Sequence, residues 1–343
     1  MATTLRPNSK IFIIGEAPGK DEVEQNEPFV GASGRELNQM LSDAGIRRSD
    51  CSLSNVFNQR PPNNEEEYFC VTKDQLPAGY SLPPLITKPK ALYVAPQYLH
   101  NLDRLKKEIE EVRPNILLAL GQTAFWALAG RTDLGSGRGV VLKSSLAPGT
   151  KLIASHHPAR VLREWSLRVI AIADFVKCAR ESSRRDLLYD KTQIWINPTL
   201  EDLYDFERCF IKADSILATD IETFGGLIRC IGFAPSEAIA LVIPFFSPKG
   251  QYWPDVQFSK ALAFVKKLVQ TYKVVFQNGG YDASYLIRYG IVPTKYTDDT
   301  MLLHHSLYPE LRKSLEFLAS IYANRPSWKK MRPRGNKTGK REE

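Results

Sequence analysis

Two groups of residues in this chain have the types and spacing that chemistry requires. The first is Gly15–Leu37, where a glycine, a carboxylate, a Pro-Gly turn and a helix start follow the apolar run Ile11–Ile14. The second is Thr219–Thr223, in which Asp220 and Glu222 are two residues apart. A strand, a glycine-rich bend and a helix start are typical of the sheet edge at which α/β proteins bind ligands. The sequence therefore predicts two sites.

The acids of the second group predict a metal site. Successive side chains of a strand point to opposite faces, so Asp220 and Glu222 share one face. Two carboxylates on one face are ligands for Mg²⁺ or Mn²⁺. Asp282 follows the apolar run Lys273–Phe276 at a helix start and is the expected third acid. The alternative is an ordinary pair of solvated acids.

Length and composition limit the classes of protein to which this chain can belong. A chain of 343 residues exceeds one core and predicts two domains. A net charge of +8 favours a polyanionic partner, although a ribosomal or membrane-surface protein would share it. Five scattered cysteines without a CxxC pair argue against a disulfide framework or a zinc ribbon. No apolar run reaches transmembrane length, so we expect an intracellular, cytoplasmic protein that uses no membrane.

The elements that must position the first group alternate along residues 1–181, which predicts an α/β domain. We expect strands at 11–14, 52–57, 115–120, 140–143 and 151–155. We expect helices at 34–44, 101–112 and 124–129, and one long helix from Pro158 to about Glu181. The proline-rich stretch 61–97 is long enough to be a functional excursion.

A second α/β domain is predicted over 192–326, after a polar linker at 182–191. We expect its strands at 215–220, 228–234, 238–243 and 273–276, the middle two forming a meander. We expect its helices at 200–211, 259–272, 282–289, 300–307 and 314–322. Residues 327–343 lose periodicity, are rich in Lys and Arg, and predict a disordered basic tail.

An ordered set of motifs in the first half carries a resemblance. GEAPG at Gly15, PFVG at Pro28, SGxxL at Ser33, Arg-Pro-Pro after Ser54-Asn-Val, and a later His-Pro-x-x-x-Leu-Arg occur in this order. The set resembles the uracil-DNA glycosylase superfamily, in particular its family 4, over about residues 10–178. The resemblance implies a three-layer α/β/α domain that takes a base out of the DNA stack.

The resemblance also implies roles for individual residues. Glu16 would position or activate the attacking water. Phe29 would stack on the flipped uracil, and Asn55 would read the edge of the base. His157 would donate a hydrogen bond to the departing uracil oxygen, which stabilises the developing charge.

Two arginines follow the His-Pro pair. Arg160 and Arg163 would contact DNA, with their loop pressing into the duplex at the lesion. Without the motifs, each site residue has an ordinary structural interpretation: a capping carboxylate, a core phenylalanine, a turn asparagine, a structural histidine and solvent-facing arginines.

The chain departs from family 4 at the positions that hold an iron-sulfur cluster there. Gln59 precedes Arg-Pro-Pro where a cysteine is expected, Ala95 or Pro96 stands near another such position, and Cys70 has the wrong spacing. Since a cluster requires thiolates, we expect none. Ala159 also replaces the serine usual after His-Pro. The alternative to catalysis is therefore a uracil-sensing or structural role.

The second half carries another resemblance. The segment VFQNGGYD, which ends at Asp282, and Asp299-Thr-Met-Leu resemble the DEDD 3′–5′ exonucleases, specifically the proofreading domain of family A DNA polymerases, over about 192–325. The resemblance implies a ribonuclease-H-like domain with a mixed sheet. Asp220, Glu222 and Asp282 would hold the metals, and Asn278 would help to place the terminal nucleotide. We expect Asp298 and Asp299 to be caps at a helix start.

The last motif of that family, a Tyr or His with a fourth Asp, is missing after Tyr322, so we expect weak or no exonuclease activity. The two domains together are similar to the front end of certain phage family A DNA polymerases. Their expected partners are single-stranded or primer-template DNA and a separately encoded polymerase domain, in the bacterial cytoplasm. The alternatives are a non-catalytic DNA-binding or polymerase-partner module and a free-standing repair enzyme.

Overall fold

The computed structural model describes residues 3–187, 192–247 and 250–323, which form two α/β units. Among these residues, the first unit comprises 3–187 and 316–323, and the second comprises 192–247 and 250–315. Residues 316–326 are predicted from the sequence to belong to the second domain, and the predicted tail at 327–343 lies outside the described residues. Within the described ranges no helix combines the length and apolar character that crossing a membrane requires.

The first unit is built around a buried parallel sheet. Its strand order is β2 (Cys51–Asn55), β1 (Ile11–Gly15), β5 (Ile116–Leu120), β7 (Lys151–Ser155) and β6 (Leu142–Lys143). Only β6 runs antiparallel to its neighbour. Every residue of the four parallel strands is buried, because helices cover both faces of such a sheet. The three-layer prediction for this domain is confirmed.

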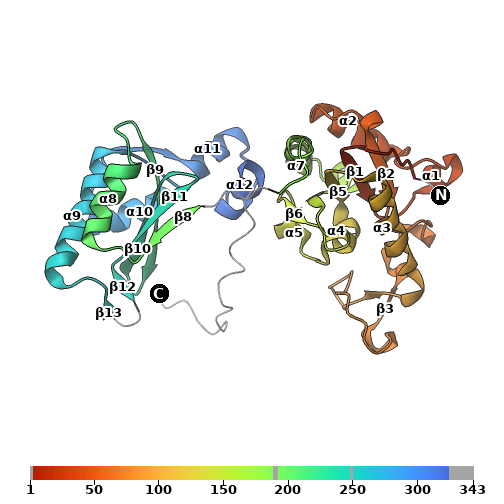
Figure 1. Cartoon of the computed structure of the whole chain (residues 1–343), viewed down its shortest axis with the longest axis horizontal. Coiled ribbons are helices and arrows are strands. Elements are labelled where there is room, and N and C mark those ends of the chain that lie inside the picture. Colours follow the sequence, from red (N-terminus) through yellow and green to blue (C-terminus); the bar gives the residue numbers. More distant parts are fainter. Residues whose placement is uncertain (1–2, 188–191, 248–249, 324–343) are drawn as a thin grey trace. The chain divides into compact units, whose positions relative to one another are not determined.

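Helices flank this sheet on both sides (Figure 1). The longer ones are α2 (Ala32–Asp43), α3 (His100–Val112), α4 (Gly121–Ala129) and α7 (Leu167–Glu181). Short ones are α1 (Lys20–Gln25), α5 (Leu134–Gly137), α6 (Pro158–Arg163) and the 3-10 helix η1 (Arg48–Asp50). The stretch 61–97 holds the hairpin β3 (Cys70–Val71) and β4 (Tyr93–Val94), with 3-10 helices η2 (Pro62–Asn64), η3 (Glu66–Phe69), η4 (Lys73–Gln75) and η5 (Pro96–Tyr98).

Two expectations for this unit were wrong, and one helix was not predicted. The long helix after His157 is two helices, α6 and α7, because Glu164 leaves the helical region with φ −135° and ψ 82°. Each piece then buries its own apolar side chains, such as Val161 on α6 and Phe175 on α7. Helix α1 was not predicted, and the strand expected at 140–143 is reduced to β6.

The second unit has the expected mixed sheet. Its strand order is β15 (Tyr296–Asp299), β14 (Lys273–Phe276), β9 (Ile216–Phe224), β10 (Leu227–Ser236), β11 (Ile239–Pro244) and β8 (Gln193–Ile196). Strands β9, β10 and β11 form an antiparallel meander, whereas β14 and β15 continue the sheet in parallel from β9. Strand β8, which was not predicted, pairs in parallel with β11.

One apolar core holds this unit together. Helices α8 (Leu200–Phe210) and α9 (Asp255–Thr271) lie side by side (Figure 1) and bury Phe206, Phe264 and Leu268 in that core. The remaining elements are α10 (Gly279–Arg288), α11 (Thr300–Leu307), and the short strands β12 (Phe246–Ser247) and β13 (Gly250–Gln251).

Helix α12 (Leu315–Tyr322) packs with the first unit. Lys177 donates hydrogen bonds to the carbonyl oxygens of Ser320 and Ala323, at 2.5 and 2.8 Å. The guanidinium of Arg138 lies over the Phe317 ring, 5.4 Å from its centroid. These contacts explain why the end of the described chain belongs with residues far earlier in the sequence, 143 positions away for Ser320 and Lys177 and 146 for Ala323 and Lys177.

Candidate functional site

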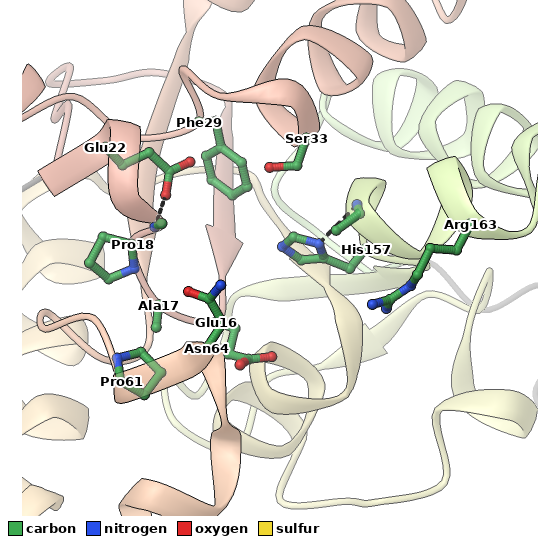
Figure 2. A pocket seen from close by; sticks show the side chains of 12 residues that line it. Glu16, Ala17, Pro18, Glu22, Phe29, Ser33, Pro61, Asn64, His157 and Arg163 are labelled. Atoms are coloured by element: carbon green, nitrogen blue, oxygen red, sulfur yellow. Dashed lines mark hydrogen bonds between the residues drawn. The ribbon is translucent and has the colours of Figure 1, made fainter. Parts of the chain in front are cut away.

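A cavity of about 370 Å³ opens at the carboxyl ends of the parallel strands in the first unit. Figure 2 shows the side chains of His157 and Arg163 entering from one side, with Pro18 and Glu22 on the other. The lining residues are Glu16, Ala17, Pro18, Gly19, Glu22, Phe29, Ser33, Pro61, Asn64, His157, Ala159 and Arg163. The structure therefore gathers Glu16, Phe29, His157 and Arg163, four of the residues singled out from the sequence.

Gly15, the last residue of β1, allows two side chains to approach the backbone closely. A Cβ there would lie 2.4 Å from Oδ1 of Asn55 and 2.6 Å from Cζ of Phe29. Asn55 ends β2 directly opposite Gly15 in the parallel register and is buried, but it does not line the cavity. Phe29 is also buried and has a positive φ of 56°. The glycine is thus the residue that lets Asn55 and Phe29 lie against the same strand end.

The hydrogen bonding of His157 defines its tautomer. Its Nδ1 accepts a hydrogen bond from the backbone N–H of Ala159, at 3.2 Å. Burial, and then the charge of Arg163, lower the pKa of His157 to about 4. The ring is therefore neutral at pH 7 and carries its proton on Nε2, which makes this atom a donor. Its centroid is 6.2 Å from that of Phe29.

Glu16 belongs to a cluster that the sequence did not predict. The Thr123 hydroxyl lies 3.2 Å from Oε2 of Glu16 and also forms a hydrogen bond with Oε1 of Glu66. Burial raises the pKa of Glu16. Burial, and then the charge of Glu16, raise the pKa of Glu66 to about 7. In the sequence, the indication of this cluster was the long stretch 61–97, which was predicted to be functional and which contains Glu66.

Arg160 and Arg163 lie on α6 and differ in position. Arg163 is exposed and lines the cavity, whereas Arg160 is exposed outside it and lies 3.4 Å from the Glu164 carboxylate. A surface ion pair of this kind contributes little to stability. Both side chains are accessible to a phosphate backbone.

The residues at the expected cluster positions do not fit an iron-sulfur group. Gln59 and Ala95 supply no thiolate, and burial, followed by the charge of Glu66, raises the pKa of the Cys70 thiol to about 12. All five cysteines are unpaired with one another. In the described ranges, no three His, Cys, Asp or Glu side chains come together as a set that could hold a metal.

The acids of the second unit are arranged as the strand period predicts. Asp220 and Glu222 are exposed on one face of β9, while Thr219 and Ile221 between and beside them are buried on the other. The buried carboxylate of Asp282, on α10, accepts a hydrogen bond from the N–H of Ile221 at 2.9 Å. Burial, and further the charge of Asp220, raise the pKa of Asp282 to about 6.

The carboxylate oxygens of Asp220, Glu222 and Asp282 are chemically suited to a divalent cation, but their positions do not form a ready coordination site. Hard carboxylate oxygens are the ligands that Mg²⁺ and Mn²⁺ prefer, and Asp220 raising the pKa of Asp282 indicates a negative potential between them. The described residues nevertheless hold no ready group of three such side chains.

Asp299 caps a helix as expected, whereas Asp298 lies exposed within β15. Its carboxylate accepts hydrogen bonds from the N–H groups of Asn278, Gly279 and Met301, at 3.0, 2.7 and 2.8 Å, and caps α11. Asn278 has a φ of 60° and starts α10, so Asp299 joins the starts of two helices.

Comparison with known proteins places the first unit in a family context. The model of the Uracil DNA glycosylase superfamily matches residues 2–182, just over half of the chain. A Type-4 uracil-DNA glycosylase of Archaeoglobus fulgidus is 32% identical over 176 residues, which are 49% of this chain and 75% of that protein. The corresponding protein of Thermotoga maritima is 30% identical over 174 residues, 50% of this chain and 76% of that protein.

Solved structures give weaker likenesses. The Aedes aegypti Nibbler EXO domain matches at 15% identity and a TM-score of 0.25, covering 35% of this chain and 58% of that one. The EXD2 exonuclease domain soaked in Mg and GMP matches at 17% identity and a TM-score of 0.22, covering 40% and 68%. At these TM-scores the likenesses carry no argument about activity.

Proposed function

The chain belongs to the uracil DNA glycosylase superfamily, and from this premise we propose that its first unit excises uracil from DNA. The observation that carries the proposal is the neutral His157, whose Nδ1 is occupied by Ala159 and whose Nε2 is left to donate into the same cavity that Glu16 lines. A fixed donor and a carboxylate around one cavity supply the two functions that glycosidic bond cleavage needs.

Each residue has one task in the proposed reaction. Phe29 stacks on the uracil that has left the duplex. Nε2–H of His157 donates to the uracil oxygen on which negative charge develops as the bond to the sugar breaks. Glu16 positions water for attack at that sugar carbon and accepts its proton. Arg163, at the cavity, and Arg160, beside it, contact the DNA backbone.

Incubation of the full chain with single- and double-stranded oligonucleotides containing uracil, scored for abasic sites, tests the proposal. We expect excision by the wild type and a loss of about 10²–10³-fold for His157→Ala, because one charge-stabilising donor is removed. Glu16→Ala is also expected to lose most activity. Arg184→Ala, an exposed change outside the cavity, is the matched control and is expected to keep it.

Absence of abasic sites with wild-type protein, combined with uracil-dependent DNA binding, would favour the alternative of a catalytically degenerate DNA-binding module. In either case the net charge of +8 supports DNA as the partner. We expect affinity to fall steeply with salt, because bound cations are released from the phosphates. Binding that does not change with salt would contradict this part of the proposal.

For the second unit we propose a divalent-cation site at Asp220, Glu222 and Asp282, as in a 3′–5′ exonuclease-like domain. A bound Mg²⁺ or Mn²⁺ would supply Lewis-acid chemistry at a phosphate. The shared face of Asp220 and Glu222, with Asp282 bonded to Ile221 between them, supports it. Electron paramagnetic resonance with Mn²⁺ tests binding without relying on activity: Asp220→Asn should release the bound Mn²⁺, and Asp214→Asn, an exposed change before β9, should not.

The wider setting is also a proposal. A uracil-excision unit joined to an exonuclease-like unit suits DNA replication and repair, in the manner of the front end of a phage family A DNA polymerase in the bacterial cytoplasm. In this setting, the expected partner is a separately encoded polymerase domain. Co-purification of a polymerase with the tagged chain from infected cells would support it.

A further inference from the structure

Glu66 is a half-buried carboxyl that contacts the site without lining its cavity. It starts the 3-10 helix η3 in the excursion 61–97, and it reaches α4 at Thr123. Through Thr123 it is linked to Glu16, which does line the cavity. The three side chains come from three separate parts of the first unit, so their meeting is a property of the fold.

The number of hydrogens available for bonding in this cluster limits the protonation states of its two carboxyl groups. A threonine hydroxyl has one hydrogen and can donate to only one carboxylate. Since Thr123 is within hydrogen-bond reach of both Glu16 and Glu66, the second contact is a hydrogen bond only if that carboxyl brings its own proton. If both carboxylates were ionised, one of them would face the lone pairs of the Thr123 oxygen with no hydrogen between the two atoms. The two negative charges would also repel each other.

We propose that Glu66 is a positioning residue that shares one proton with Glu16 through Thr123, so that Glu16 faces the cavity as a carboxylate. The chain of donors runs from the Glu66 carboxyl to the Thr123 oxygen and from the Thr123 hydroxyl to Glu16. The inference rests on the proposed glycosylase function for its catalytic consequence, because an ionised Glu16 is what accepts a proton from water.

The surroundings decide which carboxyl keeps the proton. Glu66 faces the charges of Glu16 and of Glu67 on its own helix, and its charge in turn acts on the thiol of Cys70 on β3. Burial and these negative neighbours raise the pKa of Glu66 to about 7. Burial raises the pKa of Glu16 as well, but Glu16 borders the cavity, where water can solvate its charge, and Glu66 does not. The proton therefore stays on Glu66 below neutral pH.

Carbon-13 NMR of the glutamate carboxyl groups in the full chain, titrated from about pH 4 to 9, tests the sharing without any activity measurement. We expect one carboxyl to titrate near pH 7 in the wild type, as for Glu66. That titration should be lost in Glu66→Gln and kept in Glu67→Gln, an exposed neighbour on the same helix. A wild type without a carboxyl titrating above about pH 6, or an unchanged titration in Glu66→Gln, would overturn the inference.

The pH profile of uracil excision is a second test of the proton sharing between Glu66 and Glu16. Thr123→Val removes the donor that favours the Glu16 carboxylate, so the acid limb of kcat/KM should move up by about one pH unit, about tenfold in rate below it. If Thr123 and Glu66 only supported the fold, substituting either residue would lower kcat/KM equally at every pH. Thr123→Val also serves if Glu66→Gln does not fold, and an unmoved acid limb would then overturn the inference.

The two proposals fail separately. If the titration near pH 7 is present and depends on Glu66 but no abasic sites form, the glycosylase function is wrong and the proton sharing stands. If abasic sites form while the titration is absent, the sharing is wrong and the function stands.

Discussion

The two units of this chain bury charge in different ways. The first buries opposite charges in pairs: Arg138 with Asp174 at 2.7 Å, and Lys151 with Glu181 at 3.3 Å. The second buries carboxyls that are held by backbone N–H groups, and in its described residues neither Asp282 nor Asp299 forms a salt bridge. A paired charge contributes to the fold without a ligand, whereas Asp282, held by a neutral donor and raised in pKa, leaves its charge for a cation or a proton to neutralise.

The largest expected effect tests the pairing in the first unit. Asp174→Ala removes the partner of Arg138 and the acceptor of Ser155 Oγ, leaving a buried guanidinium without its main acceptor. We expect a loss of about 3–5 kcal/mol in the free energy of unfolding of the first unit. Hydrogen exchange followed by mass spectrometry measures the two units separately, and protection of the second should not change.

The control for this change is Glu164→Ala, which breaks an exposed pair with Arg160 and is expected to cost less than about 1 kcal/mol. Equal effects of the two substitutions would show that the buried pair is not what distinguishes the units.

A second test compares close backbone packing at the two sites. A Cβ at Gly34 would lie 1.8 Å from the carbonyl oxygen of Phe29, whereas one at Gly279 would meet Cβ of Phe276 and the Tyr296 hydroxyl at 2.5 Å. We expect Gly34→Ala and Gly279→Ala each to cost at least about 1–3 kcal/mol, the former more because backbone cannot move aside. Thermal unfolding monitored by circular dichroism measures both.

Gly280→Ala is the matched control, since a Cβ there would meet nothing within 4 Å. In a helix this change should stabilise by a few tenths to about 1 kcal/mol. A loss as large as that of Gly279→Ala would contradict the packing explanation.

The unpaired charge of the second unit predicts an unusual gain. Asp282→Asn keeps an oxygen that accepts the Ile221 N–H and removes the charge, so we expect it to stabilise this unit by about 1–3 kcal/mol at pH 7. The pKa of Asp282 is raised to about 6 in the folded state, above its ordinary value of 3.8. Between these pH values the folded wild type binds more protons, so it gains stability as pH falls.

The advantage of the variant should therefore shrink below about pH 6 and vanish near pH 4, as measured by urea unfolding across this range. Saturating Mn²⁺ should shrink it too, because the cation would stabilise only the wild type. An advantage that does not change with pH would show that the charge of Asp282 is not its cause.

The smallest expected effect concerns how helices begin. In the second unit, Thr199 caps α8 and is joined to Asp202 in a capping box, whereas α2 of the first unit starts at Gly31 without a side-chain cap. Thr199→Ala should cost about 1 kcal/mol, and Gly31→Ser should not destabilise α2 through its cap. Helix-resolved hydrogen exchange checks both, and no change at α8 would contradict the capping role.

The sequence by itself determined the local elements and much of the first site. Apolar runs predicted β1, β5, β7 and β14 within a residue or so, because burial on both faces requires such runs. The two-residue period of a strand was sufficient to place Asp220 and Glu222 on one face. The motifs around Glu16 and His157 identified the cavity that the structure shows.

Tertiary structure alone decided which distant groups meet. Thr123 lies 107 residues from Glu16 and 57 from Glu66, and no periodicity relates such positions. The same holds for Asp282 on the N–H of Ile221 and for α12 on Lys177, which follow from how helices pack onto finished sheets. Side-chain periodicity is a local property, whereas proton sharing and charge pairing depend on contacts that exist only once the chain has folded.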